Sequence, residues 1–557
     1  MSRVSWESPK KTQLRIAFVL LSFLAQILAP TVPAFDTSHL IDFRSQGNTK
    51  TQSRSANGSG NVISKSSAGS QASSNHFLPT PHLDSSSPRV AQLVDSAGLR
   101  WDALHYQAIA LHGSYIFEHQ YAFSPGVPIM LRLVSFGKHY SFQLLDRLLH
   151  GQYISSRLAE YLLNTLVPLV KAGLIGLLSS EPCLEIYKLT LSITQSNDYA
   201  YLTFLVFIIM GAPPVFFRNS YAEPFFAYFS FKGMHACYRE SHLSASLYFA
   251  LATSFRSNGT ILSGFLLYDL LARPVFQELV SAFYGKGEFL TYEAAGRCFR
   301  AIRQIRLRTA LYAFILCIIV ISPFAAQQYL AYQTFCIDPD LTNALLPRPW
   351  CSARLPLIYS FAQSHYWDVG LWRYWTPSQI PNFLLAAPML LLVGGASILF
   401  LATVYRASTA EAKFKGSDRV QSIAPLDGLS LAPQMTLTLL PYALHALVLS
   451  LLLFTTAHVQ IALRVLPAAT PWASWAGAAL VMKGVQDRED GSWGENTSGA
   501  QARHSNQEVS VRKVKIPSAR TKKPGSWWTL VSHIWIGWSI VWLFVSSVLW
   551  LAFLPPA

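Results

Sequence analysis

Long apolar runs, separated by shorter polar stretches, constrain this chain more than any other feature of its sequence. Several runs approach or exceed the roughly 20 residues that a helix needs to cross the hydrocarbon core of a bilayer. Of the 557 residues, 51% are hydrophobic and only 13% are charged, about half the charged fraction of a typical soluble domain. The pattern argues against a soluble enzyme and predicts an all-α polytopic membrane protein.

About ten segments are candidate spans. Residues 14–34 follow three basic residues and exceed the length of a signal-peptide core, so we expect an uncleaved span with a cytosolic N-terminus; a cleaved signal is the alternative. The other candidates are residues 153–178, 198–217, 221–236, 243–271, 309–330, 379–405, 435–457, 472–482 and 527–553.

The basic residues predict how the spans are oriented. By the positive-inside rule, the runs at 297–308, 406–419 and 512–523 should be cytosolic. This distribution also explains the formal charge of +15 without a nucleic-acid partner.

One inconsistency remains in the crossing count. Four spans between residues 128 and 274 would return the chain to the lumen, whereas the first basic run requires an odd number of crossings. Residues 243–271 are the best suspect, because Arg-Ser-Asn-Gly at 256–259 interrupts them. We expect a broken or re-entrant helix there.

Ionisable residues inside apolar segments are functional hypotheses by default. They are Lys171, Glu223, Lys232, Arg256 and Asp269. The two lysines lie near segment ends and should snorkel or pack. Arg256 would need a fixed counter-charge, which a phosphate could supply.

Six cysteines are too few for a disulfide scaffold, and none has zinc-ligand spacing. Cys336 and Cys351 lie in a loop placed in the oxidising lumen, so we expect them to form a disulfide; two free thiols are the alternative. The Asp-Pro-Asp triplet at 338–340 is more typical of a turn than of a metal site. Asn57 begins a glycosylation sequon in the Ser-rich segment 36–99.

The densest polar constellation spans residues 100–128. Asp102 and His105 have the spacing that places them on one face of a helix lying at the membrane surface. A carboxylate there could meet a lipid-linked substrate. From the residues alone, a helix N-cap is the favoured role for Asp102.

These residues also carry a family resemblance. WDALHYQAIALHG followed by YIFEHQYAFSPGVP resembles the first lumenal loop of the PIG-V/Gpi18 family of GPI mannosyltransferases. Further blocks follow in family order to the chain end, outside insertions 36–99 and 484–525: PPVFFRNSYAEPFFAYFSF, ATSFRSNGTILSGF, PRPWC, YWDVGLWRYWTPSQIPNFLLAAP and HVQIALR. The chain departs from the family at Ser124, where an aromatic residue is usual, and around 471–475, where a Tyr-Trp pair is expected.

The resemblance implies a GT-C membrane fold and inverting transfer of an α-1,6-linked mannose. The implied donor is dolichyl-phosphate mannose, and the implied acceptor is the mannosyl-glucosaminyl-acylphosphatidylinositol intermediate, at the lumenal face of the endoplasmic reticulum membrane. A small accessory membrane subunit is a further expected partner, and no metal is expected. Asp102 stands at the Asp of the family's Trp-Asp motif. The resemblance therefore makes it the expected general base, which removes the proton of the acceptor hydroxyl. Glu118 and His119 are expected to orient the base or bind sugar.

The remaining site candidates divide by chemistry. The leaving phosphate needs fixed positive charge or hydrogen-bond donors, and the candidates are Arg256 with Asn258, Arg373 and Arg464, with Arg256 and Arg373 ranked first. Aromatic residues that could stack on sugars, hold the polyprenyl chain or form only an interfacial belt are Trp367, Trp372, Tyr374 and Trp375. Polar residues that could bind sugar hydroxyls or make only helix contacts are Gln379, Asn382, His458 and Gln460.

The predicted organisation follows the chain. It comprises a tail and first span (1–35), a disordered lumenal insertion (36–99), a catalytic lumenal loop (100–128), a transmembrane bundle (129–483) with a lumenal loop at 331–377, a cytosolic polar insertion (484–525) and a last span (526–557). One alternative function is a lipid transporter or scramblase, which should show two similarly interrupted halves; no such duplication is evident. A nearer alternative is a dolichyl-phosphate-mannose transferase with another acceptor.

Overall fold

The computed structural model describes a few residues between 12 and 20 and seven longer ranges: 102–133, 180–210, 221–278, 292–337, 348–410, 433–500 and 527–551. In these ranges the regular structure is helical and no β-strand occurs. The expected span at 153–178, Asn57 with its Ser-rich segment, and the acidic triplet at 338–340 all lie outside the described residues.

Long apolar helices dominate the described part of the chain. Five segments of it could cross a membrane by length and composition: residues 257–278, 307–337, 377–404, 434–455 and 527–549. A helix pair, residues 459–469 and 471–487, bent by 90°, makes a sixth candidate. The prediction of an all-α polytopic membrane protein is confirmed.

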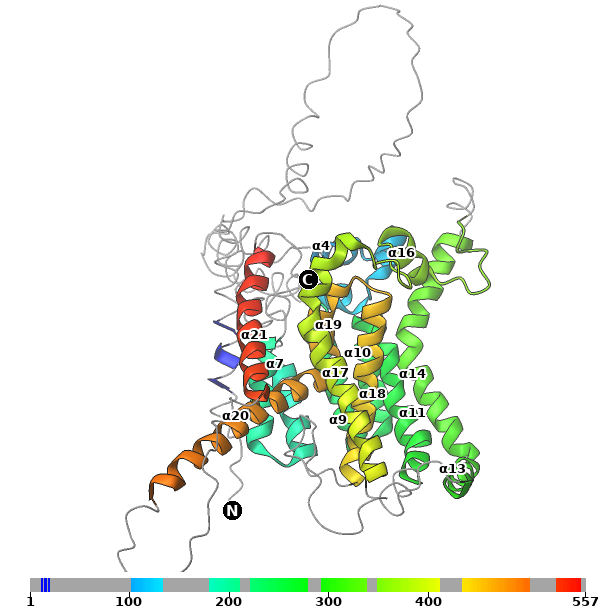
Figure 1. Cartoon of the computed structure of the whole chain (residues 1–557). Coiled ribbons are helices and arrows are strands. Elements are labelled where there is room, and N and C mark those ends of the chain that lie inside the picture. Colours follow the sequence, from blue (N-terminus) through cyan, green and yellow to red (C-terminus); the bar gives the residue numbers. More distant parts are fainter. Residues whose placement is uncertain are drawn as a thin grey trace, which may run out of the picture.

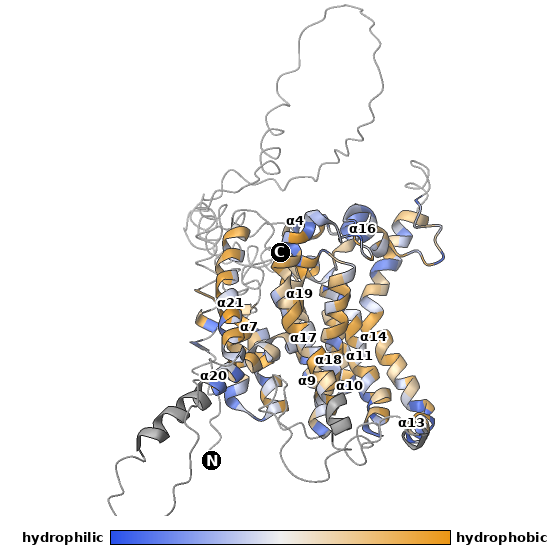
Figure 2. Cartoon of the chain, in the orientation of Figure 1, coloured by the Kyte–Doolittle hydropathy of each residue, from blue (hydrophilic) through white to orange (hydrophobic). Residues whose placement is uncertain are grey.

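The polar residues gather at the two ends of the helix bundle. Apolar residues cover α14 (Leu307–Tyr332), α17 (Ile380–Ala410) and α21 (Trp527–Leu551), whereas α13 (Tyr292–Gln304) and α16 (Ile358–Tyr366) are largely polar (Figure 2). Figure 1 shows α13 at one end of the bundle and α16 at the other. Because α14 runs between them, the basic helix α13 and residues 333–337, which follow α14, lie at opposite ends of the bundle.

Residues 242–272, the segment that made the predicted number of crossings inconsistent, form a helical hairpin. α10 (His242–Phe255) ends at Arg256, where the backbone becomes extended, and the chain returns through η3 (Ser257–Leu262), α11 (Ser263–Leu267) and η4 (Tyr268–Ala272). Nε2 of His242 lies 3.8 Å from Oδ2 of Asp269, so the two feet of the hairpin meet. The segment therefore ends on the side where it began, as expected for a broken helix, whereas residues 153–178, on which the crossing count also depends, lie outside the described part of the chain.

Gly259 makes the sharp reversal of this hairpin possible. A Cβ atom at this position would lie 2.6 Å from Cα of Thr253 on α10. Since real Cβ atoms do not approach a backbone atom so closely, any larger residue would push η3 away from α10.

The other helices complete the bundle around one apolar core. α9 (Glu223–Tyr238) packs on α10 and on α19 (Ala462–Ala469), and α17 packs on α18 (Pro433–Thr455). α20 (Pro471–Ala500) packs on α21 and on α7 (Asn197–Met210), where the Tyr199 hydroxyl donates to the Trp475 carbonyl at 2.8 Å. α20 thus continues as a helix past residue 484, where the polar insertion was expected to begin.

Candidate active site

Four elements meet at the end of the bundle that carries α16. They are α4 (Asp102–His112), the first turn of α9, the tip of the hairpin and α19. Each contributes one charged side chain: Asp102, Glu223, Arg256 and Arg464. We call these four residues the charge chain.

The charge chain alternates in sign. Nη2 of Arg464 donates to Oδ2 of Asp102 at 2.8 Å, and Nε of Arg464 lies 3.4 Å from Oε1 of Glu223. Arg256 donates from Nη1 to the same Glu223 oxygen. Each guanidinium therefore faces a carboxylate, which is the arrangement that makes buried charges tolerable.

Local sequence explains how two of these residues are presented. Pro224 lies in the first turn of α9, where a proline favours helix initiation, and the Glu223 carboxylate is favoured by the positive end of the helix dipole. Arg256 takes extended backbone angles between α10 and η3, so its side chain leaves the hairpin at the tip.

Exposure differs sharply along the charge chain. The Glu223 side chain is 1% exposed, whereas that of Asp102 is 27% exposed. Among the described residues, Oε2 of Glu223 and Nε of Arg464 are buried and have no hydrogen-bond partner. Glu223 is therefore the buried centre of the charge chain, and Asp102 is its accessible end.

An aromatic wall borders Asp102. His105, one turn along α4, stacks on Phe123 with ring centroids 4.5 Å apart and meets His119 edge-on at 5.6 Å. Trp367 contacts both Phe123 and His119 edge-on. Aromatic faces of this kind suit the apolar faces of a sugar ring.

Burial keeps the histidines of this wall neutral. Burial, aided by the neighbouring His119, lowers the pKa of His105 to about 4, although the charge of Asp102 opposes the shift. Burial also lowers the pKa of His119. Near neutral pH the positive charge beside Asp102 therefore comes from arginine.

A second cluster joins the polar candidates that follow α16. Tyr374 donates its hydroxyl proton to Gln460 at 2.8 Å and accepts a hydrogen bond from Asn382 at 2.8 Å, and Asn382 also donates to Gln379. The His458 ring stacks on Tyr374, with centroids 4.6 Å apart. The structure thus brings these five residues together.

The second cluster is connected to the aromatic wall. Nε2 of His458 lies 2.8 Å from the backbone carbonyl of Trp367. His458 also caps η7 (Val459–Ile461), which leads directly into α19 and Arg464. Polar residues from α17 and η7 therefore stand beside the wall that borders Asp102.

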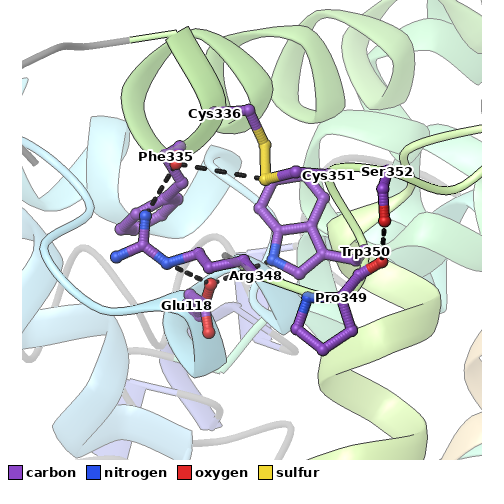
Figure 3. The surroundings of a disulfide bond; sticks show 8 residues. All are labelled: Glu118, Phe335, Cys336, Arg348, Pro349, Trp350, Cys351 and Ser352. Atoms are coloured by element: carbon purple, nitrogen blue, oxygen red, sulfur yellow. Dashed lines mark hydrogen bonds and ion pairs between the residues drawn. A yellow bond between two sulfur atoms is a disulfide. The ribbon is translucent and has the colours of Figure 1, made fainter. Parts of the chain in front are cut away.

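Glu118 belongs to a third cluster, centred on a disulfide (Figure 3). Oε1 of Glu118 lies 2.9 Å from Nε of Arg348 and accepts the indole proton of Trp350 at 2.9 Å. Oε2 accepts the hydroxyl proton of Tyr366 at 3.2 Å. These contacts fasten η2 (Glu118–Ala122) to the loop before α16 and to the last residue of α16.

A disulfide joins Cys336, in η5 (Gln333–Ile337), to Cys351, the pair expected from the sequence. Their Cα atoms are 5.7 Å apart. Arg348 lies over the Phe335 ring, 4.5 Å from its centroid, and donates to the Phe335 carbonyl at 2.7 Å. The bond thus holds the partners of Glu118 in place.

The remaining candidate cation, Arg373, is in a different environment. It pairs with Asp368 at 3.2 Å, and the two side chains are 51% and 78% exposed. Asn258, by contrast, lies at the hairpin tip near Arg256, and its buried Nδ2 atom has no hydrogen-bond partner among the described residues. Ser257 fastens this tip to α16 through the Tyr359 hydroxyl at 2.8 Å.

Two features of the site were missed in the sequence analysis. Glu223 was recognised as a charge in an apolar segment but not as the counter-charge of Arg256, for which only a phosphate was considered. Arg348 and Trp350 were recognised as part of a motif but not as partners of Glu118. Within the described ranges, no group of three or more His, Cys, Asp or Glu side chains could hold a metal ion.

The comparisons with known proteins agree with one another. The family model described as mannosyltransferase (PIG-V) matches residues 65–557. The chain is 29% identical over 488 residues to GPI mannosyltransferase 2 of Cryptococcus neoformans, covering 86% of this chain and 92% of that protein. It is 32% identical over 447 residues to GPI alpha-1,6-mannosyltransferase 2 of Mus musculus, covering 75% and 81%. No solved structure matches this chain.

Proposed function

The chain belongs to the mannosyltransferase (PIG-V) family, and from this premise we propose that it adds the second mannose, in α-1,6 linkage, during GPI-anchor biosynthesis. The donor is dolichyl-phosphate mannose, and the acceptor is the mannosyl-glucosaminyl-acylphosphatidylinositol intermediate. The reaction takes place at the lumenal face of the endoplasmic reticulum membrane. A GT-C-type bundle, a glycan on Asn57 and a small accessory membrane subunit belong to the same proposal.

One observation carries the chemical part of this proposal. The partly exposed carboxylate of Asp102 lies at the end of the bundle opposite the basic helix α13, held by Arg464 at 2.8 Å. In the proposed step, the acceptor oxygen attacks the anomeric carbon and its proton passes to Asp102. The bond from the anomeric carbon to the phosphate oxygen breaks, and dolichyl phosphate leaves with the electron pair. One such displacement inverts the β-linked donor to an α product.

The leaving phosphate gains negative charge as this bond breaks. Arg256 and Arg464 are our first choices to stabilise it, because a fixed guanidinium in a partly dry site stabilises developing charge strongly. Arg373 is a weaker choice, since its ion pair is exposed to solvent. We assign no step to a metal ion, because a single phosphate ester can be stabilised by guanidinium groups alone.

The other candidates receive supporting roles in the proposal. The aromatic wall, which includes His119 and Trp367, contacts the transferred sugar. The cluster of Tyr374, Gln379, Asn382, His458 and Gln460 binds acceptor hydroxyls. Asn258 donates to the phosphate. Glu118 holds η2 and thereby the position of His119.

The test is an assay with purified full-length protein in lipid vesicles. We expect dolichyl-phosphate mannose and the mono-mannosyl glycolipid to yield a dimannosyl product whose new linkage is α-1,6. Movement of either lipid between leaflets without transfer would favour the transporter alternative. Transfer only to a different acceptor would favour the other dolichyl-phosphate-mannose transferase.

A further inference from the structure

Glu223 contacts both arginines of the charge chain from a single carboxylate oxygen. We propose that Glu223 is a positioning residue, which shares Arg464 with Asp102 and pairs with Arg256, so that Asp102 does not face the full charge of Arg464 and can take the acceptor proton. This inference rests on the proposed function and deepens it.

The geometry makes Glu223 the shared partner. Oε1 of Glu223 accepts from Nη1 of Arg256 and lies 3.4 Å from Nε of Arg464, while Nη2 of Arg464 is bonded to Asp102. A guanidinium offers five donors in a rigid fork, so Arg464 can serve both carboxylates at once. Asp102 and Glu223 therefore compete for one cation.

Burial makes this competition consequential. The Glu223 side chain is 1% exposed and that of Arg464 is 12% exposed, so solvent screens their interaction weakly. Water reaches Asp102 more readily, as expected for a group that must exchange a proton with a substrate. Loss of the Glu223 charge would leave Asp102 as the one carboxylate paired with Arg464 among the described residues.

The remaining charged and titratable groups around the charge chain are few among the described residues. On α4 they are His105 and Tyr106, and beside α9 there is Tyr221. The hairpin tip and α19 contribute the two arginines of the charge chain itself. Burial lowers the pKa of His105 and raises the pKa of Tyr106, so both are neutral near pH 7. Asp102 and Glu223 thus carry the negative charge of the site.

The variant Glu223→Gln tests this role, because glutamine preserves shape and removes the charge. The site gains one net positive charge, and Arg464 turns fully to Asp102, which favours the ionised carboxylate. In the mannose-transfer assay we expect kcat to fall about tenfold and the acid limb of the kcat/KM profile to move to lower pH by about 0.5–1 unit. The KM for the anionic donor should fall about two- to fivefold.

Glu223→Asp is the conservative counterpart. It keeps the negative charge, so its acid limb should coincide with that of the wild type even though the shorter side chain lowers kcat. If Glu223→Gln does not accumulate, the double variant Arg256→Gln with Glu223→Gln avoids leaving Arg256 buried and unpaired. Its acid limb should move in the same direction by a smaller amount.

Glu185, which precedes α9 in the chain and contacts its other end, supplies a matched control. It is a buried carboxylate paired with His235 at 3.1 Å and Lys188 at 3.0 Å, and His235 is about 18 Å along α9 from Glu223. Glu185→Gln should leave the pH profile and the donor KM unchanged. An acid limb in Glu223→Gln that coincides with that of the wild type, or a raised donor KM, would overturn the inference. Absence of transfer by the wild type would instead refute the proposed function.

Discussion

Arg464 and Asp102 form a 2.8 Å ion pair between residues 362 positions apart in the chain. The pair joins the short helix α19 to the first turn of α4. It holds a carboxylate at the end of the bundle that also carries the disulfide, and it does so without burying the carboxylate completely. An exposed edge and a fixed orientation are both required of a general base that serves a lipid-linked sugar.

Replacing Asp102 by Asn should reduce mannose transfer by a factor of about 10²–10⁴, because asparagine cannot accept the acceptor proton. Initial rates measured at equal amounts of folded protein provide the test. Asp198→Asn, an exposed acid in the first turn of α7, is the matched control and should retain wild-type rates. An Asp102→Asn enzyme with more than half of the wild-type rate would rule out Asp102 as the base.

Arg256→Gln and Arg373→Gln should distinguish the two phosphate ligands that rank first on the sequence alone. The Arg256 side chain is 20% exposed and fixed by Glu223, whereas Arg373 shares an exposed pair with Asp368. We expect the donor KM to rise about tenfold for Arg256→Gln and less than twofold for Arg373→Gln, because solvent screens exposed charges. A donor KM that rises more for Arg373→Gln than for Arg256→Gln would show that Arg373, and not Arg256, binds the phosphate.

Glu118→Gln should lower stability more than catalysis. The substitution weakens the charge-assisted bonds to Arg348 and leaves the Trp350 and Tyr366 donors with a poorer acceptor, at a cost of about 2 kcal/mol. Thermal unfolding of the detergent-solubilised protein should show a lower Tm, and kcat of the surviving protein should stay within about threefold of wild type. A loss of activity comparable to that of Asp102→Asn, at unchanged Tm, would instead give Glu118 a catalytic role.

Removing the disulfide by Cys336→Ser with Cys351→Ser should destabilise the protein by about 3 kcal/mol, the value expected for a closed loop of about 15 residues. Because this bond holds the loop that contacts Glu118, activity at elevated temperature should decline with it. Cys298→Ser, at a free and partly exposed cysteine, is the control and should change neither. Equal melting temperatures for the two variants would contradict the prediction.

Acid should destabilise the end of the bundle that carries α4 partly through His105. Burial lowers the pKa of His105 from 6.5 to about 4, so the unfolded chain binds this proton more readily than the folded protein. The contribution to stability is fully present above pH 6.5 and is lost as the pH falls toward 4. Melting curves from pH 7.5 to 4 should therefore show a smaller loss of stability for His105→Gln. His112→Asn, at an exposed position of the same helix, should follow the wild-type curve.

Much of this architecture could be predicted because it depends on local properties of the chain. The length of an apolar run decides whether a helix can cross a bilayer. An Arg-Ser-Asn-Gly interruption can be recognised in the sequence whatever the helix packs against. The break at Arg256, the Cys336–Cys351 pair and the family position of Asp102 were all recognisable in this way. The structure places the break at the tip of a hairpin whose feet meet at His242 and Asp269.

The partners within the site were decided by tertiary structure alone. Candidates that looked equivalent in the sequence separate into the charge chain, the polar cluster around Tyr374 and the disulfide-centred cluster around Glu118. Arg256 and Arg373 were ranked together, yet one is held by a buried carboxylate and the other by an exposed one. The physical reason is that hydropathy and helix breaks belong to neighbouring residues, whereas the strength of an ion pair depends on which distant side chain faces it and how much water reaches both.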